Sequence, residues 1–100
     1  MNTLNNHQQW TFLTNHTHVL LLLAAMPDVV LREVALKAGI TERAVLRILT
    51  ELEAEGFVKR EKDGRKNRYT LNLSKPLRHP IEEKCSVADL INLIMKKNHF

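Results

Sequence analysis

Apolar residues between positions 42 and 55 recur with the period of an α-helix. A spacing of i, i+3, i+4, i+7 places side chains on one buried face of a helix. The residues at this spacing are Val45, Ile48, Leu49 and Leu52. Thr41 is a favoured capping residue before the segment, and Gly56 follows it as a residue that lets the chain turn. The pattern predicts a helix over 42–55 with one side in the core.

Two shorter helices are predicted before this one. Thr14 or Asn15 caps the first, which runs to about Met26 and is stopped by Pro27. Its second half, VLLLLAAM, is apolar throughout, which indicates burial on most sides. A brief extended piece, DVVL, separates it from the second helix, within REVALKAGI, which ends at Gly39. The second helix is amphipathic, with valine and alanine on one face and charged residues on the other.

The hydrophobic period changes from helical to alternating after Gly56. The segments FVKREK and NRYTLNL flank DGRK, and Asp-Gly between two such runs is a strong hairpin signal. In the second run one face carries Tyr69, Leu71 and Leu73, and the other carries Arg68, Thr70 and Asn72. The alternation predicts a two-stranded antiparallel hairpin.

The end of the chain predicts one more helix. SKPLRHPIEEK, with two prolines, is expected to be a linker. Ser86 then caps the helix, and Asp89 stands three residues on in a capping-box-like spacing. The apolar stripe of this helix consists of Val87, Leu90, Ile91, Ile94 and Met95. Two interpretations stay open: the stripe packs on the chain's own core, or it pairs with its twin across a two-fold axis.

Charge is concentrated on the predicted hairpin. The chain has 100 residues, a formal net charge of +4 and a pI near 9.5. Six cations and two acids fall in the ten positions from Lys59 to Arg68, so this stretch alone carries +4. Such a distribution favours an anionic partner, either a nucleic acid or an acidic membrane surface.

A helix-turn-helix with a wing accounts for these elements together. In LREVALKAGITERAVLRILT, Ala35 is small where two helices approach, Gly39 lies in the turn, and Val45 is buried in the second helix. The stretch from Thr14 to about Leu73 resembles winged helix-turn-helix transcriptional regulators of the MarR-like and ArsR-like families. The resemblance implies a mainly α fold with a small β-hairpin: a three-helix core, a wing and an extra C-terminal helix. The expected organisation is a flexible N-terminus (1–9), a DNA-binding domain (10–74), a linker (75–85) and a dimerisation helix (86–100).

The resemblance implies that the helix starting after Thr41 is the recognition helix for double-stranded DNA. Its candidate contacts are Thr41, Glu42, Arg43, Leu46 and Arg47. Arg43 and Arg47 lie one turn apart and can enter a major groove from one face, where arginine reads guanine. Alternatively they form surface ion pairs, for example between Arg47 and Glu51. Leu46 stands where a polar residue is usual. It could contact a thymine methyl, or it could pack against the wing or another protein.

The predicted hairpin supplies the remaining DNA candidates, which are Arg60, Lys62, Arg65, Lys66 and Arg68. With Arg65 and Lys66 at its tip, the hairpin can reach a phosphate backbone or a narrow minor groove, while the others line its flank. A simpler explanation is a cationic edge that blocks aggregation. That explanation accounts for one or two lysines, but not for six cations in ten residues.

Partners and alternatives follow from the resemblance. A helix beyond the wing commonly dimerises such regulators, so a homodimer is expected. Its candidate residues are Trp10, Phe12, Val87, Leu90, Ile91, Ile94 and Met95. The competing functions are a protein-interaction module without specific DNA readout, and non-specific or RNA binding.

Other chemistry is not indicated by the sequence. His16 and His18 are two apart, which places them on different sides of a helix and makes them poor chelators. The remaining candidate ligands are scattered without ligand spacing: His7, His79, Cys85 and His99. No metal, cofactor or catalytic site is therefore expected. One cysteine and no signal-peptide pattern favour a reducing cytoplasm, and an apolar run of eight residues is too short to cross a bilayer.

Overall fold

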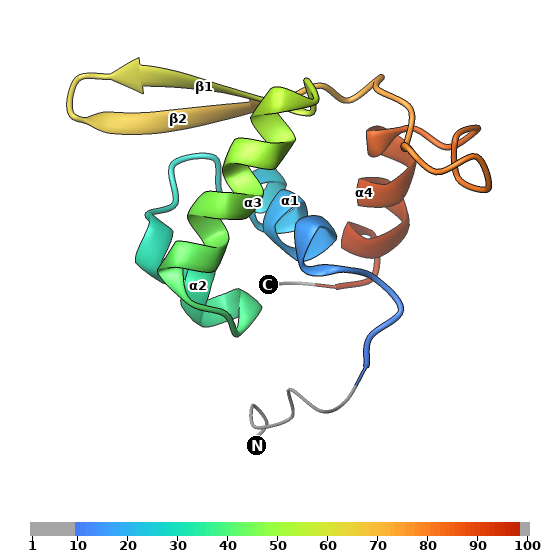
Figure 1. The fold of residues 1–100 in the computed structure, drawn as a ribbon, viewed down its shortest axis with the longest axis horizontal. Helices are drawn as coiled ribbons and strands as arrows, with labels where there is room; N and C mark the ends of the chain where they lie inside the picture. The colour runs from blue at the N-terminus through green and yellow to red at the C-terminus, as the bar shows by residue number, and fades with distance from the viewer. Residues whose placement is uncertain (1–9, 99–100) are drawn as a thin grey trace.

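A computed structural model describes residues 10–98 of the chain. Three helices form its centre: α1 (Asn15–Ala25), α2 (Leu31–Ala38) and α3 (Glu42–Ala54). α1 lies behind α3 and contacts both α2 and α4 (Figure 1). The expected flexible segment 1–9, together with His7 and His99, lies outside the described residues.

The central position of α1 explains its all-apolar sequence. Five consecutive residues, Val19 to Leu23, are buried, because neighbouring elements cover the helix on several sides. The predicted buried stripe of α3 is confirmed, since Val45, Ile48, Leu49 and Leu52 are all in the core. α2 contributes Val34 and Ala35, and the small alanine side chain permits the close approach of α2 and α3.

The turn between α2 and α3 is set by one glycine and one cap. Gly39 has φ +75°, a left-handed conformation that side chains with a Cβ rarely adopt, and its N–H donates to the carbonyl of Ala35 at 2.9 Å. Thr41 then accepts a hydrogen bond from the backbone N–H of Ala44 at 3.0 Å. Both sequence signals are confirmed. Thr14, in contrast, precedes α1 without a side-chain capping bond.

The hairpin consists of β1 (Val58–Asp63) and β2 (Lys66–Leu71), paired antiparallel with Val58 opposite Leu71 and Asp63 opposite Lys66. Its two-residue loop is therefore Gly64–Arg65. Within this loop, Gly64 has a positive φ of +68° and Arg65 does not. A positive φ at the first loop position is the feature of a type II′ turn. Of the two residues predicted at the end of the hairpin, Arg65 lies in the loop, and Lys66 directly follows the loop and forms the last pair of the ladder with Asp63.

The base of the hairpin belongs to the core, while its outer half projects from the helices (Figure 1). Val58 and Tyr69 are buried on the face that meets the helices. Leu73 was predicted to extend this face, but the strand ends at Leu71. The chain then turns and leaves Leu73 exposed.

The last helix, α4 (Val87–Met95), packs against α1. Its predicted capping box is confirmed: Ser86 Oγ accepts from the N–H of Asp89 at 3.2 Å, and Asp89 Oδ2 accepts from the N–H of Ser86 at 2.8 Å. Val87 and Ile91 are buried in the chain's own core. For these two residues, the structure decides between the two interpretations of the stripe in favour of internal packing.

The segment between β2 and α4 folds back on itself. Pro76 pairs with Ser86 in an isolated antiparallel bridge, and the N–H of Leu77 donates to the carbonyl of Cys85 at 3.0 Å. These bonds close the loop at its base. Altogether the chain forms the mainly helical winged helix-turn-helix with an added C-terminal helix that the sequence predicts.

Candidate nucleic-acid interface

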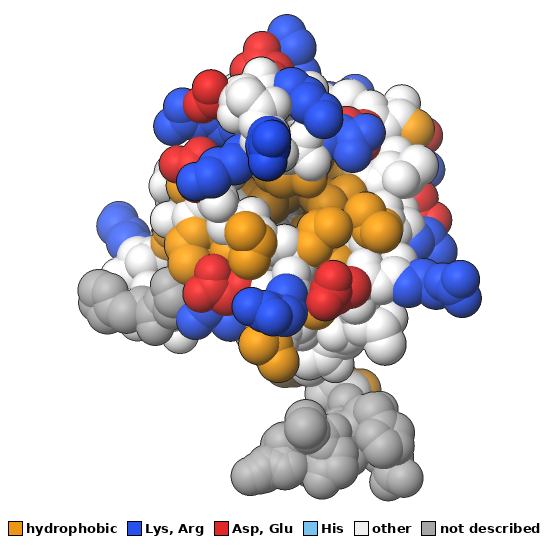
Figure 2. All heavy atoms as spheres, turned by 90° about the vertical axis from the view of Figure 1, so that its left-hand side faces the viewer, with side chains coloured by type: hydrophobic (Ala, Val, Ile, Leu, Met, Phe, Trp, Pro, Cys, Tyr) orange, Lys and Arg blue, Asp and Glu red, His pale blue; other side chains and the backbone are white. Residues whose placement is uncertain are grey.

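The start of α3 and the tip of the hairpin share one side of the molecule. A groove between them is lined from the hairpin by Arg65, Lys66 and Asn67, and from α3 by Glu42. The rest of its lining comes from Tyr69 and from the 28–32 segment before and at the start of α2. Figure 2 views this side: lysine and arginine side chains crowd its upper part, and a hydrophobic hollow lies beneath them. The hollow gives the candidate interface an apolar floor below a cationic rim.

The predicted outward face of α3 is exposed. Glu42, Arg43, Leu46 and Arg47 are all on the surface, while Val45 between them is fully buried. Thr41 is also exposed, and its hydroxyl hydrogen stays available because its oxygen is the acceptor in the capping bond. Arg43 has no ion pair within residues 10–98. The face therefore combines one unpaired arginine, one arginine in a network and one exposed leucine.

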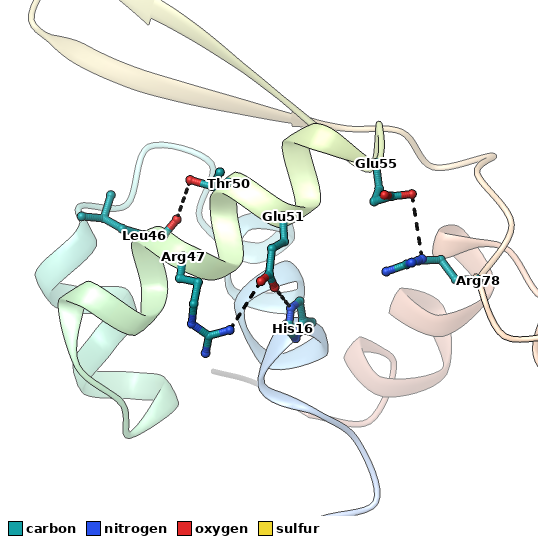
Figure 3. A network of polar contacts seen from close by, with 7 residues as sticks. All are labelled: His16, Leu46, Arg47, Thr50, Glu51, Glu55 and Arg78. Carbon is teal, nitrogen blue, oxygen red and sulfur yellow. Dashed lines mark hydrogen bonds and ion pairs between the residues drawn. The ribbon is translucent and has the colours of Figure 1, made fainter.

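Arg47 belongs to a network that joins α3 to α1. Its Nη1 lies 3.5 Å from Glu51 Oε2, and Glu51 Oε1 lies 2.6 Å from His16 Nε2 (Figure 3). The hydrogen bond with His16, assisted by Arg47, lowers the pKa of Glu51 below its usual value, so the carboxylate stays ionised. The surface pair predicted as the alternative for Arg47 is therefore present.

His16 is the member of this network that sequence reasoning missed. It was considered only as a metal ligand, and its partner lies 35 residues away on another helix. Only the packing of α1 against α3 brings the two together. The neighbouring His18 is partly buried, and desolvation lowers its pKa below the usual value.

Leu46 is exposed at 45% and points away from the His16 side of α3 (Figure 3). Beside it, the hydroxyl of Thr50 donates to the carbonyl of Leu46 at 3.0 Å. Thr50 is thus turned back onto its own helix. Leu46 is thus an exposed apolar side chain on the same face of α3 as the charged residues Arg43 and Arg47.

The six hairpin cations divide into two groups. Three have carboxylate partners: Arg60 with Glu53 at 3.2 Å, Arg68 with Asp28 at 3.5 Å and Lys59 with Glu61 at 3.6 Å. The other three, Lys62, Arg65 and Lys66, have no carboxylate within 4 Å among the residues described, and we call them the tip cations.

The strand register also divides the predicted flank. Arg60 stands opposite Tyr69 and Lys62 opposite Asn67, so these two cations share the face of the hairpin that includes Tyr69. Arg68 stands opposite Glu61 on the other face. The three cations predicted to line the flank of the hairpin are therefore divided between its two faces.

The predicted dimerisation residues are divided between core and surface. Val87 and Ile91 are buried, and Leu90, Ile94 and Met95 are partly buried. Trp10 and Phe12 are 76% and 91% exposed and stack edge to face, with ring centroids 4.9 Å apart. Leu93 of α4, which the stripe did not include, is also exposed. Among the predicted dimerisation residues and their neighbours on α4, the exposed apolar side chains are thus Trp10, Phe12 and Leu93 rather than the centre of the stripe.

The described residues form neither a metal site nor a membrane-spanning helix. No group of three or more His, Cys, Asp or Glu side chains within residues 10–98 is placed to hold a metal ion. None of the helices described combines the length and apolarity needed to span a bilayer.

Comparison with known proteins gives a structural likeness but no sequence match. No protein-family model matches the chain, and no curated protein matches it. Among solved structures, a matching chain is the zinc-dependent MarR family transcriptional regulator AdcR in its Zn(II)-bound state, with 25% sequence identity and a TM-score of 0.47. The match covers 64% of this chain and 46% of that chain, so this chain spans less than half the length of that regulator. That structure bears the MarR family name that the sequence resemblance suggested, while the likeness to ArsR-like proteins stays a prediction.

Proposed function

We propose that the chain is a sequence-specific duplex DNA-binding transcriptional regulator of the cytoplasm that acts as a homodimer. In this proposal α3 enters the major groove, and the hairpin lies on the backbone or in the minor groove. The observation that carries it is the groove lined by both Glu42 of α3 and the tip cations Arg65 and Lys66. A duplex seated across that groove would meet the start of α3 and the hairpin at once.

Charge pairing supports DNA over a merely soluble edge. The solubility explanation is sufficient for Lys59, Arg60 and Arg68, whose charges are already balanced by carboxylates. It does not explain why three further cations cluster at the tip without such partners. Phosphates would supply the missing counter-charge and release condensed cations on binding.

The homodimer of this proposal uses other residues than the centre of the α4 stripe. Val87 and Ile91 are occupied in the core, so the candidate surface shifts to Trp10, Phe12 and Leu93. Two-fold symmetry would place two α3 helices on half-sites about 34–36 Å apart. Sedimentation equilibrium of the wild type and of the Trp10→Ser/Phe12→Ser variant tests this, with Leu73→Ser as the control for removing an exposed apolar side chain. A dimer that survives the double substitution would contradict the assignment of these two aromatic residues.

The test of specific readout is selection of bound duplexes from a random pool. Wild-type protein is expected to enrich a pseudo-palindromic sequence, and the Arg43→Ala/Arg47→Ala variant is expected to enrich none. A Lys96→Ala/Lys97→Ala variant, which removes two exposed cations outside the proposed interface, should enrich the wild-type sequence. If the arginine variant also enriched it, α3 would not be the recognition helix.

A protein-interaction module is the second candidate function, favoured by the exposure of Leu46 on the outward face of α3. It predicts a stable protein complex that Leu46→Glu abolishes, together with no measurable affinity for duplex DNA. A third possibility, RNA or non-specific binding, predicts equal affinity for a duplex and a hairpin RNA. One titration with both ligands separates it from the leading proposal.

A further inference from the structure

The polar side chains on the outward face of α3 are not equally available to base edges. Arg47 is held toward the C-terminal end of the helix by Glu51, four residues on, at 3.5 Å. Glu51 cannot simply swing away with Arg47, because its other carboxylate oxygen is hydrogen-bonded to His16 of α1. Figure 3 shows this chain of contacts running along one side of α3. Arg47 is thereby oriented away from the start of the helix.

Thr50 is not free to donate to a base, for a different reason. Its hydroxyl donates to the carbonyl of Leu46 at 3.0 Å, one turn back on the same helix. A hydroxyl whose hydrogen is used in this way cannot also donate to a base. Among the outward side chains of α3 from Arg43 to Thr50, Arg43 and Leu46 are therefore the two that are not engaged in a contact within the protein.

These two residues are three positions apart, so they lie on the same face of α3. The helix rises about 1.5 Å per residue, which separates them by roughly 4.5 Å along its axis. The step between successive base pairs is roughly 3.4 Å. Side chains at this separation can address neighbouring base pairs, one through a guanidinium and the other through an apolar surface.

We infer that Arg43 and Leu46 form the base-reading pair of α3, and that its target carries a thymine methyl group beside the guanine contacted by Arg43. The inference rests on the proposed DNA-binding function and specifies its readout. Arginine donates two hydrogen bonds to guanine O6 and N7, and the thymine C5-methyl is the apolar feature of the major groove. Arg47 then serves as a backbone contact or a positioning residue, not as a base reader.

The charges around Leu46 favour DNA over an apolar protein surface as its partner. Arg43 and Arg47 flank it on α3, and the groove between the start of α3 and the hairpin is lined by Arg32, Arg65 and Lys66 together with Asp28 and Glu42. An apolar protein partner covering Leu46 would have to desolvate these neighbouring cations. A thymine methyl lies in a groove edged by phosphates, so a duplex offers an apolar contact and counter-charges together.

The test uses a duplex selected by the wild-type protein and the same duplex with each thymine replaced in turn by deoxyuridine. Deoxyuridine removes the C5-methyl and keeps base pairing. At one position in each half-site, wild-type affinity is expected to fall about fourfold, corresponding to ~0.8 kcal/mol for one buried methyl-sized group. Leu46→Ala should bind the thymine duplex more weakly and show no further loss with deoxyuridine at that position. Leu73→Ala, an exposed leucine after β2 that lies outside the proposed DNA-binding and dimer surfaces, is the matched control and should retain the wild-type sensitivity.

Two outcomes overturn the inference. Equal sensitivity of the wild type and Leu46→Ala would assign the methyl effect to another residue or to duplex shape. A wild type indifferent to deoxyuridine everywhere would show that Leu46 reads no methyl group. In both cases the wild type still selects and binds its duplex, so the proposed function stands. Failure of the wild type to select any duplex would instead remove the proposed function itself.

Discussion

The division of the hairpin cations into paired and unpaired sets predicts a specific change in salt dependence. Each phosphate contact to B-DNA contributes about 0.9 to the slope of log affinity against log salt. If the tip cations Lys62, Arg65 and Lys66 each contact one phosphate, replacing all three with alanine should make the slope shallower by about 2.7 per protomer. For a dimer with both hairpins engaged the change is about 5.4, twice that value.

The matched control removes the same charge from the same hairpin. Lys59, Arg60 and Arg68 are each within 4 Å of a carboxylate, and their triple alanine variant also lowers the net charge from +4 to +1 (4 − 3 = 1). Its slope is expected to change by less than about 1, because these charges are already balanced within the protein. Fluorescence anisotropy with a mixed-sequence duplex at four or more salt concentrations measures both variants. Equal changes in the two slopes would refute the reasoning, since only overall charge would then matter.

Three further predictions concern stability. Ile48→Ala removes a fully buried side chain of α3 and should lower the free energy of unfolding by about 2–5 kcal/mol in urea denaturation; a loss well under 1 kcal/mol would contradict the described core. Ser86→Ala breaks the capping box of α4 and should cost about 0.5–2 kcal/mol, whereas Ser86→Asp should restore most of it. Glu51→Gln tests the contact with His16: because the folded-state pKa of Glu51 is lowered, its stabilisation is complete above the usual value of 4.5 and is lost as pH falls through the folded-state pKa. The difference in Tm between wild type and Glu51→Gln should therefore be constant near neutral pH and shrink in acid, and a pH-independent difference would contradict this assignment.

Much of the fold was predictable because local signals agree with tertiary packing. The periodicity of α3 identifies all four of its buried residues, since one helix face alone meets the core. Gly39 and the Ser86–Asp89 pair mark helix boundaries through backbone chemistry that does not depend on distant residues. The residues of α3 that are not in this buried stripe then form its outward face.

The ion pairs of the site residues and their positions on the hairpin were not predictable, because they depend on contacts between distant segments. Arg60 pairs with Glu53 of α3 and Arg68 with Asp28, and neither spacing is a signal in the sequence. The strand register, fixed only when the hairpin closes, decides that Arg65 lies in the loop and that Lys66 forms the last pair of the ladder. The apolar stripe of α4 had two physically sound partners, and only the position of α1 shows that Val87 and Ile91 are used internally.

The most direct measurement of the central claim is the affinity of the wild-type protein for a duplex as salt is varied. With three tip cations on each of two protomers, six phosphates are neutralised, and the log–log slope should be about −5 or steeper. A hairpin RNA of equal length, titrated in parallel, should bind more weakly. Absence of binding at low salt, or a slope near zero, would contradict the assignment of α3 and the hairpin as a DNA-binding surface.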